Sequence, residues 1–268
     1  MTDQPSSTRC AAFFDLDKTI LATSSSLALQ GSFVDAGLIS RRAALMSVIV
    51  HLPYLIQGAD EERMDQMARV IGDLARGMDA HAVERIVEDS LGAVIDPVCY
   101  VQALEQIASH RAQGHPIVIA SASVEQIVRP IARMLGADHV LATSAGIDEN
   151  GAYTGEILHY NQAHGKAEAC ARLAAQQGWD LAECWAYSDS VSDEPLLASV
   201  GHPVAVNPDR GLRDIAVERG WQIMHFTTRA RVRRRVPQLP LPVAAAGVGI
   251  AVGVGVGAWA LLASRRAA

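Results

Sequence analysis

Three short apolar runs, each closed by a polar residue, limit most strongly what this chain can fold into. They are CAAFFD (residues 10–15), HPIVIAS (residues 115–121) and ECWAYSD (residues 183–189). Apolar runs of this length are typical of strands that are buried on both faces of a sheet. Helix-like stretches alternate with them, namely YVQALEQIASHRAQG, VEQIVRPIARMLGA and KAEACARLAAQQG. This alternation predicts an α/β fold with a doubly wound parallel sheet, in which ligands bind at the carboxyl ends of the strands.

Two segments interrupt the alternation. Residues 24–95 hold apolar-periodic, helix-like stretches and no clear strand, which predicts an inserted helical cap. The core would then consist of residues 9–23 and 96–227. Further on, TSAGIDENGAYTGEI places Asn150 and Gly151 between two β-like arms, and this pair predicts a β-hairpin.

The C-terminal part of the chain has a different character. Residues 228–241 are basic and proline-rich and predict an extended linker. Residues 242–263 carry no charge and, at about 1.5 Å per residue, are long enough to cross a hydrocarbon layer roughly 30 Å thick, so we expect one transmembrane helix. Five arginines precede it and two follow it, so the positive-inside bias predicts a single-pass protein of the cell membrane with its body in the cytoplasm. Gly249, Gly253 and Gly257 form a double G-x-x-x-G pattern through which two such helices would pack as a homodimer.

The acidic balance of the body excludes one class of partner. Seven of the chain's 23 basic residues are arginines after residue 228, where there is no acidic residue, so 16 basic residues stand against 29 acidic ones before that point. A body this acidic would repel a phosphate backbone, and we expect no nucleic-acid partner. The four cysteines are far apart and form neither a C-x-x-C pair nor a zinc-finger spacing, so we expect free, buried thiols.

Polar side chains gather where the three predicted strands end. Asp15 and Asp17 follow the first strand, Ser121 closes the second, and the third ends at Asp189 with Asp193 four residues later. Because the carboxyl ends of parallel strands meet at one edge of a sheet, these five side chains should lie together. So many carboxylates require a cation to balance them.

The two lysines of the chain are the candidates for that cation. The sequence uses arginine 21 times and lysine only at positions 18 and 166, and each lysine lies beside a strand-end motif. A compact, flexible ammonium contacts oxygen atoms differently from a planar guanidinium, which gives a reason to keep lysine at these positions. Lys166 begins the helix between the second and third strands and should reach the same edge of the sheet.

Phosphoryl transfer to a carboxylate is the chemistry that uses these groups together. One aspartate attacks phosphorus to form an aspartyl phosphate, and a second protonates the leaving group and later activates water. A serine hydroxyl, a lysine ammonium and Mg²⁺ would neutralise the phosphoryl oxygens, and Mg²⁺ is the expected cofactor because it prefers carboxylate oxygens and water. At a spacing of two residues just past a strand, Asp15 as nucleophile and Asp17 as acid and base can reach one cavity.

Four motifs, in this order, resemble those of the haloacid dehalogenase (HAD) superfamily: DLDKT, the first serine of SAS in IVIASAS, GKAEAC and YSDSVSDEPLL. The helical insertion directly after the first motif is similar to one cap type of that superfamily. Residues 9–227 as a whole resemble its phosphoserine-phosphatase-like subfamily, subfamily IB. One such motif is weak by itself, whereas four in order are specific.

The resemblance implies a role for each matching residue. Asp15 would be the nucleophile and a metal ligand, and Asp189 would be a further metal ligand. Asp17 would be the acid/base and would also offer Mg²⁺ its backbone carbonyl.

The remaining matches concern the phosphate. Ser121 and Lys166 would hold it, and Asp193 would orient Lys166 or a metal-bound water. Ser123 could take the part given to Ser121, although Ser121 lies nearer the strand end. Ser188 stands where glycine is common in the superfamily.

The function implied by the resemblance is Mg²⁺-dependent hydrolysis of a phosphomonoester through an aspartyl phosphate. Phosphoserine phosphatases of the superfamily show a pattern like F-x-x-S-x-x-x-R early in the cap, and no such pattern follows Ser26. We therefore expect the substrate to be a small phosphorylated metabolite or, given the predicted anchor, a lipid phosphate.

Particular residues argue against other functions. Dehalogenases of the superfamily normally lack the second aspartate, so Asp17 argues against that chemistry. P-type ion pumps share DKT, but that frame would make Asp17 the nucleophile and leave no acid two residues later. A phosphotransferase or phosphomutase of the same superfamily stays open, and so does a catalytically inactive membrane adaptor, although an adaptor would not need the acidic residues and Lys166 together.

Overall fold

The computed structural model describes residues 10–39, 72–73 and 75–229. By its contacts the chain divides into a unit of residues 1–232 and a second unit of residues 233–268. All described residues belong to the first unit.

The predicted transmembrane helix, residues 242–263, lies outside the described residues. The same holds for residues 230–241 of the predicted linker and residues 40–71 of the predicted cap. Within the ranges that the structure describes, no helix is both long enough and apolar enough to cross a membrane.

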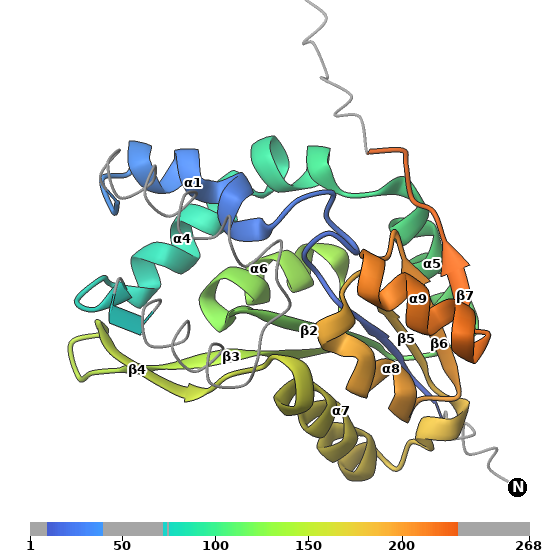
Figure 1. Ribbon diagram of the computed structural model, residues 1–268. Helices are drawn as coiled ribbons and strands as arrows, with labels where there is room; N and C mark the ends of the chain where they lie inside the picture. Colours follow the sequence, from blue (N-terminus) through green and yellow to red (C-terminus); the bar gives the residue numbers. More distant parts are fainter. Residues whose placement is uncertain (1–9, 40–71, 74, 230–268) are drawn as a thin grey trace, which may run out of the picture. The chain divides into compact units, whose positions relative to one another are not determined.

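The described residues form a seven-stranded sheet with the strand order β4-β3-β2-β1-β5-β6-β7 (Figure 1). Its strands are β1 (Ala12–Phe14), β2 (Ile117–Val124), β3 (His139–Ile147), β4 (Tyr153–His159), β5 (Trp185–Ser188), β6 (His202–Val206) and β7 (Gln222–Met224). Neighbouring strands run parallel, except that β3 and β4 are antiparallel. The three apolar runs form β2, β1 and β5 at the centre, so the predicted parallel α/β sheet is confirmed.

The predicted hairpin is also confirmed, since β3 and β4 are joined through Asn150 and Gly151. The Asp148 carboxylate accepts hydrogen bonds from the backbone N–H groups of Asn150 and Ala152, at 2.9 and 3.0 Å. Gly151 has a φ of 82°, which a residue with a Cβ rarely adopts.

Helices cover both faces of the sheet (Figure 1). The core helices are α5 (Val101–Ala112) and α6 (Glu125–Leu135) on one face and α7 (Ala163–Gln177), α8 (Glu194–Ser199) and α9 (Arg210–Arg219) on the other. Phe14 and Ile119 pack in the cluster with α5 and α6, whereas Phe13 and Val118 pack with α7, α8 and α9. Because side chains alternate along a strand, apolar residues are needed at every position, which explains the unbroken apolar runs.

The described part of the insertion is helical. It contains α1 (Ser25–Asp35) and α4 (Ala80–Ser90), and α4 continues into a π-helical turn (Leu91–Ile95) and a 3₁₀ turn (Asp96–Val98). Leu29 of α1 and Val87 of α4 belong to the same apolar cluster as Ile131 of α6. The predicted boundaries of the cap remain predictions, but its described helices share a core with the sheet.

The insertion leaves the core and returns to it through two adjacent segments. The Ala22 N–H donates to the Val98 carbonyl at 2.7 Å, and the Tyr100 N–H donates to the Ile20 carbonyl at 2.8 Å. These bonds form a short antiparallel pairing between the outgoing and the returning chain.

Candidate active site

The predicted site residues lie at the carboxyl ends of the central strands. Phe14 of β1 pairs with one residue of β2 and one of β5, and Asp15 is the next residue after it. Ser121 and Asp189 each follow those partners of Phe14 by two positions. The topology therefore brings one residue from each of three strands to a common edge.

The end of β2 differs from the prediction. We expected the strand to end at Ser121, whereas β2 continues to Val124. Its pairing with β3 is interrupted, however, because Ala120 lies opposite Leu141 and the next paired residue, Val124, lies opposite Thr143. Between these two pairs the chain moves four positions along β2 but only two along β3. Ser121 is therefore the first residue of a bulge that interrupts the regular pairing.

A buried ammonium joins two of the predicted carboxylates. Lys166 Nζ donates to Asp15 Oδ1 and to Asp193 Oδ2, each at 2.8 Å, and Lys166 is only 2 % exposed. Both carboxylates oppose the cost of burying the ammonium and raise the pKa of Lys166 overall. A charge buried this deeply persists only when it is paired, so the cation and the two aspartates form a unit.

The turn before α7 explains the glycine that precedes this lysine. A Cβ at Gly165 would lie 2.6 Å from the Tyr160 carbonyl oxygen, closer than such contacts allow. A glycine at this position lets the chain pass close to Tyr160 and deliver Lys166 in the first turn of the helix.

Asp193 has a second donor that the sequence analysis did not assign. Ser188 Oγ donates to Asp193 Oδ2 at 2.6 Å, and Ser188 is fully buried. The other oxygen, Asp193 Oδ1, is buried without a hydrogen-bond partner among the described residues. A buried carboxylate oxygen left in this state costs stability unless a group outside the described chain contacts it.

Asp189 adds further negative charge beside Asp15. Burial raises the pKa of Asp189 to about 8, and Asp15 adds to the shift while Lys18 opposes it. Burial likewise raises the pKa of Asp15 to about 7, against the opposing effect of Lys166. Thr19 Oγ1 donates to Asp189 Oδ1 at 3.2 Å and is another contact that the sequence analysis did not assign.

Two donors from other parts of the fold contact the Asp17 carboxylate. The Ser25 N–H donates to Asp17 Oδ1 at 2.7 Å, and Ser123 Oγ donates to Asp17 Oδ2 at 2.9 Å. Ser123 also links Asp17 to Ser121, because its N–H donates to Ser121 Oγ at 3.1 Å. The two serines of SAS therefore have different positions in the site.

The arrangement fits a magnesium ion. Among the described residues, no three histidine, cysteine, aspartate or glutamate side chains could hold a metal ion together. Mg²⁺ in phosphoryl-transfer sites usually takes one or two carboxylates and keeps several waters. Asp15 supplies a buried carboxylate and Asp189 a partly buried one, and the unpartnered Asp193 Oδ1 can accept from a water ligand.

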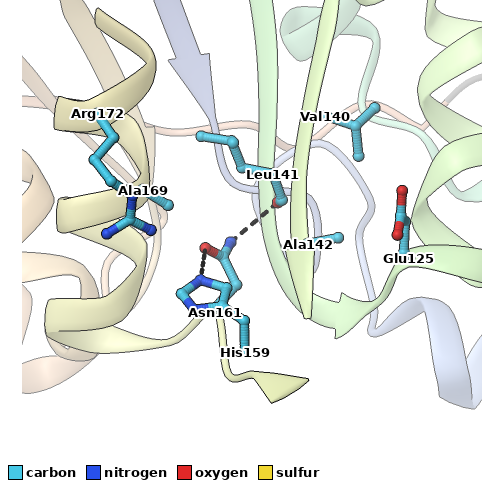
Figure 2. Close-up of a pocket in the computed structure, with 8 residues that line it drawn as sticks. All are labelled: Glu125, Val140, Leu141, Ala142, His159, Asn161, Ala169 and Arg172. Atoms are coloured by element: carbon cyan, nitrogen blue, oxygen red, sulfur yellow. Dashed lines mark hydrogen bonds between the residues drawn. The ribbon is translucent and has the colours of Figure 1, made fainter. Parts of the chain in front are cut away.

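A cavity with a volume of about 210 Å³ lies beside this edge (Figure 2). It is lined by Glu125, Val140, Leu141, Ala142, His159, Asn161, Ala169 and Arg172. Asn161 is fully buried, and its Nδ2 donates to the carbonyls of Leu141 and Ser121, at 3.0 Å each. The cavity contains none of the predicted site residues, but Asn161 ties its wall to the β2 bulge.

Comparison with known proteins decides the family. The model of the haloacid dehalogenase-like hydrolases matches residues 12–198, which include all six predicted site residues. The chain belongs to the haloacid dehalogenase-like hydrolases.

Relatives of this hydrolase include proteins named for quite different properties. It is 46% identical to a probable phosphatase of Mycobacterium tuberculosis over 229 residues, covering 85% of this chain and 79% of the relative. It is 45% identical to an "inhibition of morphological differentiation protein" of Streptomyces azureus, covering 85% of this chain and 83% of that protein.

Two solved structures share the fold of this chain. A protein of unknown function from Bordetella pertussis matches with a TM-score of 0.70 and 32% identity, covering 81% of this chain and 98% of that one. A phosphoserine phosphatase in its apo form matches with a TM-score of 0.59 and 16% identity, covering 83% and 94%. The predicted membership of the HAD superfamily, with a phosphoserine-phosphatase-like body, is confirmed, and the protein is a phosphatase of this family.

Three residues of the HAD site escaped assignment from the sequence. Thr19 and Ser188 lie inside the motifs and are both fully buried, and a buried hydroxyl needs a hydrogen-bond partner. The indication for Ser25 is weaker in the sequence, because serines at the start of a helix are also expected as N-cap residues.

Proposed function

We propose that this protein hydrolyses a phosphomonoester in two steps, with Asp15 as the nucleophile, Asp17 as the acid and base, and Mg²⁺ as the cofactor. The observation that carries the proposal is the buried contact of Lys166 with Asp15 and Asp193, with Asp189 nearby. Burial, and then the charge of Asp15, raise the pKa of Asp189. Salt bridges alone do not require this excess of carboxylates, whereas phosphoryl transfer does.

In the first step, a carboxylate oxygen of Asp15 attacks phosphorus while the bond from phosphorus to the ester oxygen breaks. Lys166 holds Asp15 Oδ1, which leaves Oδ2 for the attack. Asp17 gives its proton to the departing oxygen, so the alcohol leaves neutral.

In the second step, Asp17 takes a proton from water as the water oxygen attacks the phosphorus of the aspartyl phosphate. The bond to Asp15 breaks, inorganic phosphate leaves, and both aspartates return to their starting states. Lys166 and Ser121 would offset the charge on the phosphoryl oxygens in both steps. When bound, Mg²⁺ would neutralise further charge on those oxygens, held by Asp15, Asp189 and the backbone carbonyl of Asp17.

The test compares Asp15→Asn with the parent. Release of inorganic phosphate from 4-nitrophenyl phosphate should fall by at least about 10³-fold, because amide nitrogen and oxygen cannot replace the nucleophile. Asp214→Asn, an exposed change on α9, serves as the matched control and should retain full activity. Equal rates for Asp15→Asn and the parent would overturn the nucleophile assignment, and transfer of phosphate only to an added alcohol would favour a phosphotransferase.

For the substrate, we propose a small phosphorylated metabolite or a lipid phosphate. The absence of an F-x-x-S-x-x-x-R pattern after Ser26 gives no support for phosphoserine. A Mg²⁺-supplemented screen of phosphorylated metabolites and of lipid phosphates in mixed micelles would distinguish the two classes by kcat/KM.

We also propose that residues 242–263 anchor the protein in the cell membrane, with the catalytic body in the cytoplasm and the Gly-rich span as a contact between two copies. The support is the uncharged length of that segment and the arginines before it. Full-length protein should need detergent for extraction, and deletion of residues 237–268 should release it. Extraction of the full-length protein by buffer alone would overturn this proposal.

A further inference from the structure

We infer that Ser123, supported by Ser25, is a positioning residue that holds the carboxyl group of Asp17 in place for proton transfer to the leaving group. This inference rests on the proposed function, because it concerns the acid and base of that reaction. It assigns Ser123 a part different from that of Ser121.

Both oxygens of the Asp17 carboxylate are occupied by donors from different parts of the fold. Oδ1 accepts the Ser25 N–H at 2.7 Å from the start of α1, and Oδ2 accepts the Ser123 hydroxyl at 2.9 Å from the end of β2. A carboxylate with one donor on each oxygen cannot turn about its Cβ–Cγ bond without losing a hydrogen bond. The pair of donors therefore fixes the plane of the acid as well as its position.

The two donors also contact each other. Ser25 Oγ and Ser123 Oγ lie 3.1 Å apart, and Ser25 is fully buried. Since the Ser123 hydroxyl donates to Asp17, its oxygen can accept the Ser25 hydroxyl, which orients the Ser123 proton toward Asp17. Ser25 thus acts on Asp17 twice, directly through its N–H and indirectly through Ser123.

The bulge in β2 explains how two nearby serines, Ser121 and Ser123, can have different roles. The Ser123 N–H donates to Ser121 Oγ at 3.1 Å, so the Ser121 oxygen is fixed while Ser123 points its own hydroxyl at Asp17. In a regular strand, residues two apart would project from the same face side by side. The interrupted pairing between Ala120 and Val124 is what allows one serine to serve the phosphate site and the other to serve the acid.

Ser25 connects this network to the insertion. It is the first residue of α1, whose preceding residue Ser24 caps the helix by accepting the Leu27 N–H. Any displacement of the start of α1 would move the donor to Asp17 Oδ1. The orientation of the acid is therefore tied to the placement of the first insertion helix.

The experiment uses a series of aryl phosphates that differ in leaving-group basicity, from 2,4-dinitrophenyl to phenyl phosphate, with full-length protein and Mg²⁺. A poor leaving group needs the proton of Asp17, whereas a good one departs without it. Ser123→Ala should therefore lower kcat at least about 10-fold more for phenyl phosphate than for 2,4-dinitrophenyl phosphate. Ser121→Ala should lower the rate for all members of the series by a similar factor, because phosphate contacts are common to them.

Two further variants separate positioning from folding. Ser123→Thr keeps the hydroxyl and should restore most of the phenyl phosphate activity, and Ser25→Ala keeps the N–H and should show a smaller loss of the same kind. Thermal unfolding of each variant measures its fold independently of turnover.

The outcomes distinguish this inference from the proposed function. An equal loss across the series for a folded Ser123→Ala variant, or no rescue by threonine, would overturn the inference and leave the proposed function standing. A parent protein that releases no phosphate from any member of the series would overturn both.

Discussion

Polar groups are buried at both ends of the central strands, but those at the amino end are aromatic and histidine rings, whereas those at the carboxyl end are charged. At the amino end, His115 and His202 stack on Trp185, with ring centroids 4.9 and 4.2 Å apart from it. His110 Nε2 shares a hydrogen bond with the Tyr187 hydroxyl at 2.8 Å, and its Nδ1 lies 3.0 Å from His115 Nδ1. Burial lowers the pKa of His110 and of His115, which favours the neutral form of these two rings.

At the carboxyl end, the groups cannot neutralise one another. Lys166 faces Asp15 and Asp193, and Asp189 adds a third, partly buried carboxyl group, to which Thr19 donates. The comparison teaches that burial alone does not mark a site. Buried charge that the chain does not fully compensate is the stronger indication of a functional site, because it costs stability and is kept where catalysis needs it.

The largest expected effect is at the centre of the charged end. Lys166→Met leaves Asp15 and Asp193 buried without their cation, so the free energy of unfolding should fall by about 3–5 kcal/mol and phosphatase activity should be lost. Arg213→Met, which removes an exposed cation on α9, should alter stability by less than about 0.5 kcal/mol. Urea unfolding followed by circular dichroism measures both, and similar values for the two variants would show that the buried ion pair does not stabilise the fold.

A smaller effect is expected from the metal. Mg²⁺ at about 100 times its dissociation constant should stabilise the folded protein by about 2–3 kcal/mol, because it binds the folded carboxylates and not the unfolded chain. The measurement is thermal unfolding with Mg²⁺ and with EDTA. Asp189→Asn should abolish the difference, and if this variant responds like the parent, Asp189 is not a ligand.

The neutral end should instead respond to acid. Burial and then His115 lower the pKa of His110 from 6.5 to about 4. Because the unfolded chain takes up this proton near pH 6.5 and the folded protein only near pH 4, the free energy of unfolding should fall as pH drops between these values, by about 3 kcal/mol. Equilibrium unfolding across this range should show a flatter pH dependence for His110→Phe than for His225→Asn, an exposed control. Equal slopes would mean that His110 is not buried as a neutral group.

The smallest effect concerns the serine that supports Asp193. Ser188→Ala removes the donor to Asp193 Oδ2 and should cost about 1 kcal/mol of stability, with Lys166 still in place. Differential scanning calorimetry would measure the change. A variant more stable than the parent would show that the buried Ser188 hydroxyl destabilises the fold.

Much of this comparison could be predicted from the sequence, because it depends on local patterns. Unbroken apolar runs predicted the central strands, and strand ends predicted that Asp15, Asp189 and Lys166 would meet, since parallel topology fixes which ends come together. The hairpin at Asn150 and Gly151 followed from turn chemistry that involves only neighbouring residues.

What the sequence did not predict depends on contacts between distant residues. Ser123 and Asp17 are 106 positions apart, and their bond depends on how β2 is paired with β3 beyond Ala120. A slip in strand pairing leaves the residue pattern of β2 unchanged, so nothing in the sequence distinguished the orientation of Ser121 from that of Ser123.

The short pairing between the outgoing and returning chain at Ala22 and Val98 has a consequence for how new specificity could be engineered. Because the two ends of the insertion are hydrogen-bonded to each other, a different segment could be grafted between them without spreading the strands of the core. Such a graft would have to begin after Ser25, so that Asp17 keeps its donors, and would have to present an apolar face to Ile131. Within those two conditions, the insertion could be exchanged while the groups at the catalytic edge keep their contacts.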